Sequence, residues 1–187
     1  EADWVMVLAH WSDELFPYPR SEDRKIAGEL ANAGVDIVVS HHPHVVRGME
    51  VIGSCPIFYS LGNFFFSEFR DDSGKWTPHW APRNHEGLGV LISFKHGQKP
   101  EYRVLSFWQQ KNQVIEDPFH RAARRMDLTS QPLRRFQNAE YDQWYLTNRQ
   151  QFDKLWARWH FGVRRLGMKG AAQYVLRAVQ NRIKQDK

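Results

Sequence analysis

Runs of apolar residues, separated by polar stretches, divide the first part of the chain into short elements. Residues 4–9 and 35–40 are apolar runs that predict strands, and the β-branched residues of the run over 35–40 predict a buried strand. Between them, residues 21–33 carry an apolar stripe at helical spacing, with Ser21 as the expected N-cap and Gly34 as the expected stop. The order strand, helix, strand predicts an α/β sheet whose crossover connection we expect to be right-handed.

Further along the chain the pattern changes to shorter and more alternating segments. Residues 57–61 predict another strand, and residues 67–86 form a long polar loop. Residues 88–94 and 102–107 are separated by a Gly- and Pro-containing stretch, which predicts a hairpin.

The second part of the chain has helical rather than strand periodicity. Apolar residues recur at three- and four-residue spacing over 139–160, and a second helix is expected over 171–185. Large aromatics left in water would form an unusually large apolar patch, so we expect four side chains of the first helix to be buried: Trp144, Phe152, Leu155 and Trp159. We therefore divide the chain into an α/β part, residues 1–120, and a helical extension, residues 121–187.

Charge is distributed unevenly between these two parts. Residues 121–187 contain fifteen Lys/Arg and five Asp/Glu, a net charge of about +10, whereas residues 1–120 have about −5. A basic helix with aromatics can bind nucleic acid or an anionic membrane surface, or attract a polyanionic substrate. There is no clear nucleic-acid motif, and the spread of the basic residues favours helices that pack through their aromatics and solvate their charges. A weak contact between this tail and an anionic surface stays open as an alternative.

Composition excludes some classes of protein. Of the 187 residues, 42% are hydrophobic and 14% aromatic, which is not the composition of a disordered chain. No apolar run reaches about 18 residues, so no membrane span is expected, and the first residues do not have a signal-peptide pattern. The single cysteine, Cys55, cannot form an intrachain disulfide, and we expect it to be buried as a small hydrophobe.

Histidines follow both of the first two predicted strands. His10 comes directly after residues 4–9, and His41-His42-Pro43-His44 comes directly after residues 35–40. Open α/β sheets bind their ligands at the strand ends, and neutral imidazole is a common metal ligand. We therefore expect His10, His42 and His44 to converge on one sheet edge and to bind metal. A histidine at a strand end can also be an ordinary hydrogen-bonded group, and for His10 taken alone this is the more frequent case.

Residues 5–66 resemble the bacterial capsule-synthesis (poly-gamma-glutamate, CapA-type) family of the calcineurin-like metallophosphoesterase superfamily. The segment from Val7 to Glu14 resembles the family's strand followed by His-Trp-Gly-x-Glu, and the segment from Gly34 to Val46 resembles its Gly-Ala-Asp-x-Val-x-Gly-x-His-Pro-His motif. The segment from Pro56 to Phe64 is similar to its Tyr-Ser-Leu-Gly-Asn-Phe segment. Three positions depart from the pattern: Ser12 and Ser40 stand where glycine is usual, and Arg47 where glutamine is common.

The resemblance implies a fold and a metal centre. The fold would be a partial calcineurin-like metallophosphoesterase sheet, followed here by the helical extension. Two divalent metal ions (Mn, Fe or Zn) would be expected in the intact protein, with His10 and His42 on one metal and His44 on the other. The substrate would be a phosphoester or a polyanion, in a bacterial protein of the cytoplasm or the cell envelope.

Other residues near these motifs are weaker candidates. Asp13 and Glu14 are the nearest acids in sequence, although loop solvation or capping explains them at least as well. His41 and Asn63 are candidate pocket residues, and Asn63 equally suits a turn. Glu86 and His85 precede the hairpin and are further candidates for a pocket.

The resemblance also implies what this chain does not contain. The superfamily supplies Asp, Asn and a catalytic His from upstream motifs, and none of these precedes His10 here. A two-metal phosphoesterase needs a bridging carboxylate, so we expect little turnover from this chain alone. The alternative is a non-catalytic binding module with a degenerate metal site. The coding sequence immediately upstream discriminates the two, because Asp, Asn and His motifs there favour the enzyme and a start codon near Glu1 favours the module.

Overall fold

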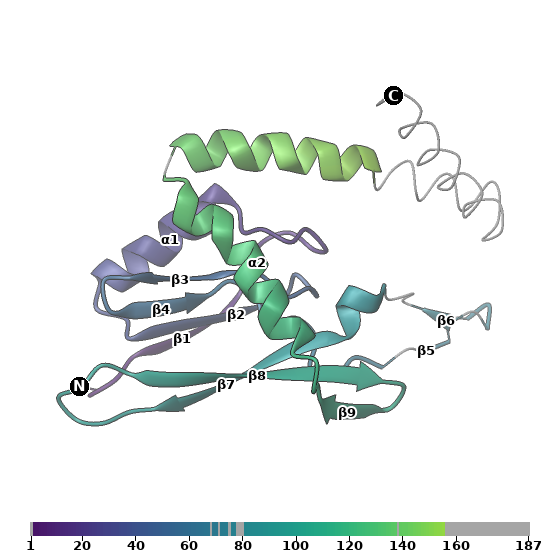
Figure 1. The fold of residues 1–187 in the computed structure, drawn as a ribbon, viewed down its shortest axis with the longest axis horizontal. Helices are drawn as coiled ribbons and strands as arrows, with labels where there is room; N and C mark the ends of the chain where they lie inside the picture. The colour runs from purple at the N-terminus through teal and green to yellow at the C-terminus, as the bar shows by residue number, and fades with distance from the viewer. Residues whose placement is uncertain are drawn as a thin grey trace. The chain divides into compact units, whose positions relative to one another are not determined.

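The computed structural model describes residues 2–67, 69–70, 72–74, 76–77, 81–137 and 139–155. By its internal contacts the chain divides into two compact units, Glu1–Tyr145 and Leu146–Lys187. The first unit holds the strands and helices shown in Figure 1. Its strands are β1 Met6–His10, β2 Ile37–His41, β3 Met49–Ile52, β4 Cys55–Phe58, β5 Phe69–Arg70, β6 Trp76–Thr77, β7 Glu86–Ser93, β8 Glu101–Gln110 and β9 Gln113–Glu116. Its helices are α1 Ser21–Asn32, the 3-10 helix η1 Pro82–His85 and α2 Arg121–Arg135, and residues 139–155 form a further helix that continues into the second unit.

The main sheet has four strands in the order β1-β2-β4-β3. β1, β2 and β4 are parallel, and β3 pairs antiparallel with β4. The buried strand β2 is apolar because both of its faces are covered, whereas β1 lies at the sheet edge with Met6 and Leu8 exposed. The predicted α/β character of this region is therefore confirmed.

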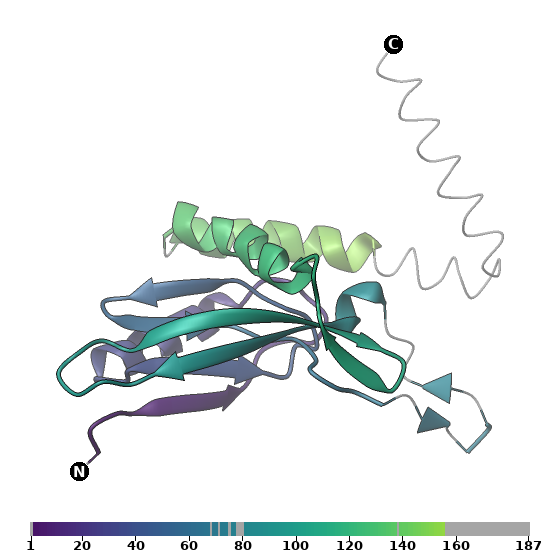
Figure 2. The ribbon, with the colours of Figure 1, turned by 60° about the horizontal axis from the view of Figure 1, so that its bottom comes forward.

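A second sheet follows the loop region. β7, β8 and β9 form an antiparallel meander, and the β7–β8 hairpin predicted from the sequence is confirmed. β5 and β6 form a separate two-stranded ribbon. Figure 2 shows the long β7–β8 hairpin with α2 lying along it, in agreement with the contacts of α2 with β3, β7 and β8.

The core of the first unit joins segments that lie far apart in sequence. α2 contributes Ala122 and Met126, and β7 contributes Leu88. The main sheet and the loops that follow its strands supply the rest: Ile37, Val39, Val46, Met49, Phe58 and Leu61. α2 packs on this core, and the first compact unit continues past residue 120. The division of the chain into two domains at residue 120 stays a prediction.

The start of α1 differs from the expectation. Arg20, not Ser21, occupies the N-cap position, and the Asp23 carboxylate accepts the Arg20 N–H at 2.8 Å. This carboxylate therefore satisfies the backbone N–H of the N-cap residue, and Ser21 is the first residue of the helix rather than its cap. The helix ends as predicted, since Gly34 follows with φ of 92°.

The aromatic helix is only partly as expected. Tyr141 and Tyr145 are buried in the first unit, and Trp144 is half-buried between Tyr18 and Phe136. Leu155 is 65% exposed, so its predicted burial is wrong. Trp159 and the helix expected over 171–185 lie outside the described residues. In the part of the chain that the structure covers, no helix has the length and apolarity that crossing a membrane requires.

Candidate functional site

Three histidines meet at the carboxyl ends of β1 and β2. The parallel register places His10 opposite His41. The ring centroids of His10 and His42 lie 4.7 Å apart, and those of His42 and His44 lie 6.2 Å apart. The structure therefore brings His10, His42 and His44 to one sheet edge, as their positions after the strands predict.

The backbone around these histidines adopts unusual conformations. Three non-glycine residues have positive φ: 78° at Ser12, 97° at His42 and 57° at His44. Such conformations cost free energy and persist where the surrounding structure holds them, often at functional sites. The positive φ values at His42 and His44 therefore bend the chain directly after β2 ends at His41.

His41 differs from its neighbours. Its side chain is exposed at the end of β2. Partial desolvation, and secondarily the nearby His10, lower its pKa below the usual histidine value. His41 is therefore neutral at physiological pH, which limits the positive charge at this edge.

His44 is the most firmly held of the histidines. Its Nδ1 lies 2.9 Å from the Asn63 Oδ1, and the Phe66 ring packs against it at 5.1 Å and 89°. Asn63 is buried and donates from Nδ2 to the Asn84 carbonyl at 3.0 Å. Asn63 thus lies beside the histidines, as one of the candidate pocket residues.

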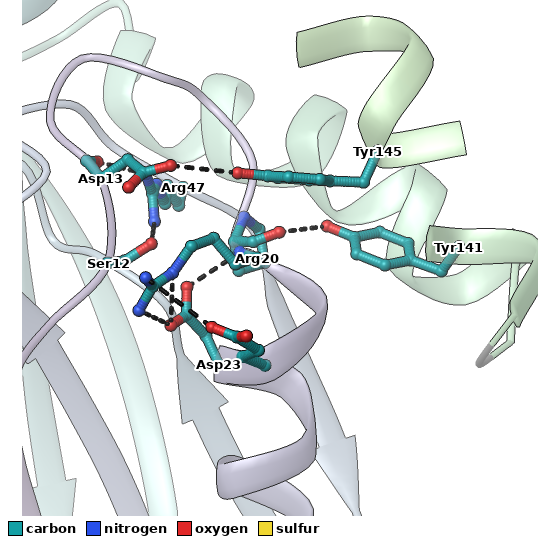
Figure 3. A network of polar contacts seen from close by, with 9 residues as sticks. Ser12, Asp13, Arg20, Asp23, Arg47, Tyr141 and Tyr145 are labelled. Carbon is teal, nitrogen blue, oxygen red and sulfur yellow. Dashed lines mark hydrogen bonds and ion pairs between the residues drawn. The ribbon is translucent and has the colours of Figure 1, made fainter. Parts of the chain in front are cut away.

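Arg47 fastens the loop after His10 to the loop after His44. Its guanidinium is 1% exposed and donates to the Phe16 carbonyl at 2.9 Å, the Asp13 carbonyl at 2.6 Å and the Ser12 hydroxyl. Burial lowers its pKa to about 10, so it stays charged at neutral pH. Figure 3 shows this guanidinium beside Ser12 and Asp13.

Two tyrosines of the helix over residues 139–155 cover the same loop. The Tyr145 hydroxyl donates to the Asp13 carboxylate at 3.2 Å, and the Tyr141 hydroxyl donates to the Pro19 carbonyl at 2.7 Å (Figure 3). Phe16 meets the Tyr145 ring edge-on at 5.3 Å. The loop that follows His10 is therefore held both by Arg47 and by these two tyrosines.

The acidic candidates have other surroundings. The Asp13 carboxylate binds Tyr145, Glu14 is exposed, and Glu86 forms an ion pair with Arg125. His85 lies beside Trp108, with ring centroids 5.7 Å apart. Within the described residues no group of three or more His, Cys, Asp or Glu side chains is arranged to hold a metal ion.

Several residues of this site were not singled out from the sequence. Asn84, Phe66 and Tyr145 reach it from distant segments, and no local pattern marks them. Arg47 does carry a signal, because a lone arginine between Val46 and Met49 in an apolar run indicates a buried cation that needs acceptors.

Comparison with known proteins finds a family match for the segment that contains these histidines. Residues 1–68 match the model of the family described as bacterial capsule synthesis protein PGA_cap. Over 67 residues the chain is 46% identical to the PGA biosynthesis protein CapA of Bacillus subtilis (strain 168), which covers 36% of this chain and 18% of that protein. It is 43% identical over 67 residues to the capsule biosynthesis protein CapA of Bacillus anthracis, which covers 36% of this chain and 16% of that protein. The resemblance seen in the sequence motifs is confirmed, and the match spans less than a fifth of the length of these relatives.

Proposed function

We propose that this chain belongs to a capsule- or poly-gamma-glutamate-biosynthesis protein of the calcineurin-like metallophosphoesterase type, which hydrolyses a phosphoester with divalent metal ions. The observation that carries the proposal is the meeting of His10, His42 and His44 on one sheet edge, inside the segment that matches the capsule-synthesis family. The parallel strands β1, β2 and β4 and the crossover helix α1 are compatible with that fold.

The donor set fits the imidazole part of a two-metal centre. His10 and His42 would hold one metal ion and His44 the other, and the Asn63 contact at the His44 Nδ1 is of the kind that orients metal-binding histidines. The carboxylate ligands would come from segments upstream of this chain in the intact protein. A bound divalent metal (Mn, Fe or Zn) would neutralise phosphate charge and lower the pKa of water.

The chain's own residues prepare the edge for such a ligand. Arg47 and Tyr145 fix the loop that follows His10, and Asn63 fixes the ring of His44. His41, neutral because of its lowered pKa, adds no repulsion toward a metal cation. An anionic phosphoester or polyanionic substrate would then approach this edge.

Metal binding tests the proposal directly. The purified chain, stripped with a chelator, is titrated with Zn²⁺ or Mn²⁺ and followed by calorimetry. We expect binding that is weakened at least tenfold by His42→Ala and by His44→Ala, because each substitution removes a ligand. His96→Ala is the matched control, since His96 is exposed in the β7–β8 turn. Equal affinity in the wild type and in both site variants would refute the proposed metal site.

Activity tests the second part of the proposal. A longer polypeptide that includes the upstream segments should hydrolyse an aryl phosphate and lose this activity with His42→Ala. The chain alone should show little or no turnover, because a two-metal site needs a bridging carboxylate and the described residues contain no group of three or more His, Cys, Asp or Glu side chains that could hold a metal ion. Strong metal-dependent hydrolysis by the chain alone would mean that a local acid completes the site.

A non-catalytic binding module is the second candidate. The engagement of Asp13 by Tyr145 and the exposure of Glu14 favour it, because the Asp13 carboxylate already accepts a hydrogen bond from the tyrosine. A longer polypeptide that binds metal or a polyanion but hydrolyses no phosphoester would support this function over the first.

A further inference from the structure

His44 belongs to a closed ring of hydrogen bonds that includes two buried asparagines. The His44 Nδ1 meets the Asn63 Oδ1 at 2.9 Å, and the Asn63 Nδ2 donates to the Asn84 carbonyl at 3.0 Å. The Asn84 Nδ2 closes the ring by donating to the His44 carbonyl at 2.8 Å. Asn63 and Asn84 are 6% and 3% exposed, so water competes little with these bonds.

Backbone groups determine the direction of every bond in this ring. The carbonyl of Asn84 can only accept, so the amide of Asn63 must present Nδ2 to it and Oδ1 to His44. Asn84 is oriented in the same way, because its Nδ2 meets the His44 carbonyl and its Oδ1 accepts the Ala81 N–H at 3.1 Å. Turning either amide over would place oxygen against oxygen, so neither amide is ambiguous.

The tautomer of His44 follows from this direction. An amide oxygen is an acceptor only, and the nitrogen that faces it must carry the proton. In the neutral ring the proton is therefore on Nδ1 and the lone pair on Nε2.

Packing prevents the ring of hydrogen bonds from relaxing. A Cβ atom at Gly87 would lie 2.3 Å from the Asn63 carbonyl oxygen, so β7 presses directly on the Asn63 backbone. On the other side, Gln109 of β8 binds the backbone of Phe66 twice, accepting its N–H at 2.9 Å and donating to its carbonyl at 2.8 Å. Phe66 is thereby held edge-on to the His44 ring.

We infer that Asn63 and Asn84 are positioning residues that lock His44 as its Nδ1–H tautomer, so that a metal ion would be coordinated through Nε2. The second clause rests on the proposed function, whereas the tautomer does not. Asn84 lies beyond the segment that matches the capsule-synthesis family, so the lock depends on the part of the chain that follows residue 68.

Nuclear magnetic resonance of the imidazole nitrogens tests the lock in the metal-free protein. With ¹⁵N-labelled histidine and a chelator present, at a pH where the ring is neutral, we expect His44 in the Nδ1–H form. Asn63→Leu removes the acceptor at similar volume and should shift His44 toward the Nε2–H form that an isolated imidazole prefers. Asn63→Asp loses the donor to the Asn84 carbonyl but keeps an acceptor for the His44 Nδ1, so at a pH where the ring is neutral it should retain the Nδ1–H form.

Two further measurements separate positioning from general loss of structure. Ser130→Ala is the matched control, because Ser130 is buried and bonds Met49 and Met126 away from the histidines. It should lower the melting temperature without changing the His44 tautomer. In the wild-type chain Zn²⁺ affinity should exceed that of Asn63→Leu by about 10–100-fold, the usual effect of losing a partner of a ligating histidine.

The outcomes distinguish this inference from the proposed function. A wild-type His44 in the Nε2–H form would overturn the inference, and so would an unchanged tautomer in folded Asn63→Leu. If Asn63→Leu does not fold, loss of the Nδ1–H form in Asn63→Asp would overturn it equally. A correct tautomer in a chain that binds no Zn²⁺ would count against a metal site formed by this chain's histidines alone and leave the lock supported.

Discussion

Arg47 offers a sharp test of what holds the histidine edge together. Replacing it with methionine keeps most of the aliphatic stem and removes the guanidinium. The Phe16 carbonyl, the Asp13 carbonyl and the Ser12 hydroxyl then lose their donor. Two effects oppose each other, because a desolvated cation disappears while three acceptors lose a charged donor.

The structure allows the two effects to be compared. The lowering of the pKa of Arg47 to about 10 is equivalent to about 3 kcal/mol of cost for the charged form. Each acceptor that loses its charged donor costs about 1–3 kcal/mol, or roughly 6 kcal/mol for three. We therefore expect Arg47→Met to lower the free energy of unfolding by about 2–4 kcal/mol.

Urea denaturation followed by circular dichroism gives this free energy. The control is Arg124→Met, because Arg124 is exposed on α2 and should change the free energy by less than about 0.5 kcal/mol. A variant Arg47→Met as stable as the wild type, or more stable, would refute the reasoning. It would mean that desolvation of the cation outweighs its three bonds, as happens for some buried ion pairs that are replaced by apolar residues.

Three other predictions concern pH, packing and backbone strain. Burial raises the pKa of Tyr59 and Tyr141, so the stability they contribute is present below pH 10 and lost as the pH rises above it. The free energy of unfolding, measured between pH 8 and pH 11, should fall less steeply in Tyr141→Phe, and an equal slope would contradict this. Gly48→Ala places a Cβ atom 2.6 Å from the α2 backbone and should destabilise the fold by about 1–3 kcal/mol, whereas an unchanged melting temperature would argue against close packing there. Ser12→Gly and Ser12→Ala both remove the acceptor of Arg47, but only glycine relieves the positive φ, so the alanine variant should be less stable by about 1 kcal/mol; the reverse order in thermal melts would count against strain.

Much of the fold could be predicted from the sequence, because the local hydrophobic patterns agree with the tertiary packing. β2 is a continuous apolar run that is buried on both faces, and the β7–β8 hairpin follows its alternation and its turn. α2 lies in the predicted helical extension, but its bounds were not predicted although Ala122, Met126 and Leu133 form an apolar stripe, because Pro132 and many arginines obscure that stripe. β3 and β9 have only four residues each, which is too short to show clearly the two-residue alternation of a strand.

The candidate site was predictable to the extent that strand ends define it. Two neighbouring parallel strands end at the same edge of a sheet. His10 and His42 could therefore be placed close together from the sequence. The partners of these histidines could not, because Asn84 comes from a 3-10 helix after a long loop and Tyr145 from a helix more than a hundred residues away. Such contacts depend on the whole fold rather than on any local spacing.

The core of the first unit has a consequence for how this protein can be divided or recombined. Sequence similarity to the capsule-synthesis family is found in residues 1–68, yet Val46, Phe58 and Leu61 are buried against Leu88 and Met126. The matching segment is therefore not a module that can be cut out, because truncation after residue 68 would expose its core to water. A chimaera that exchanges this segment with a relative must carry matching residues from β7 and α2, or repack them.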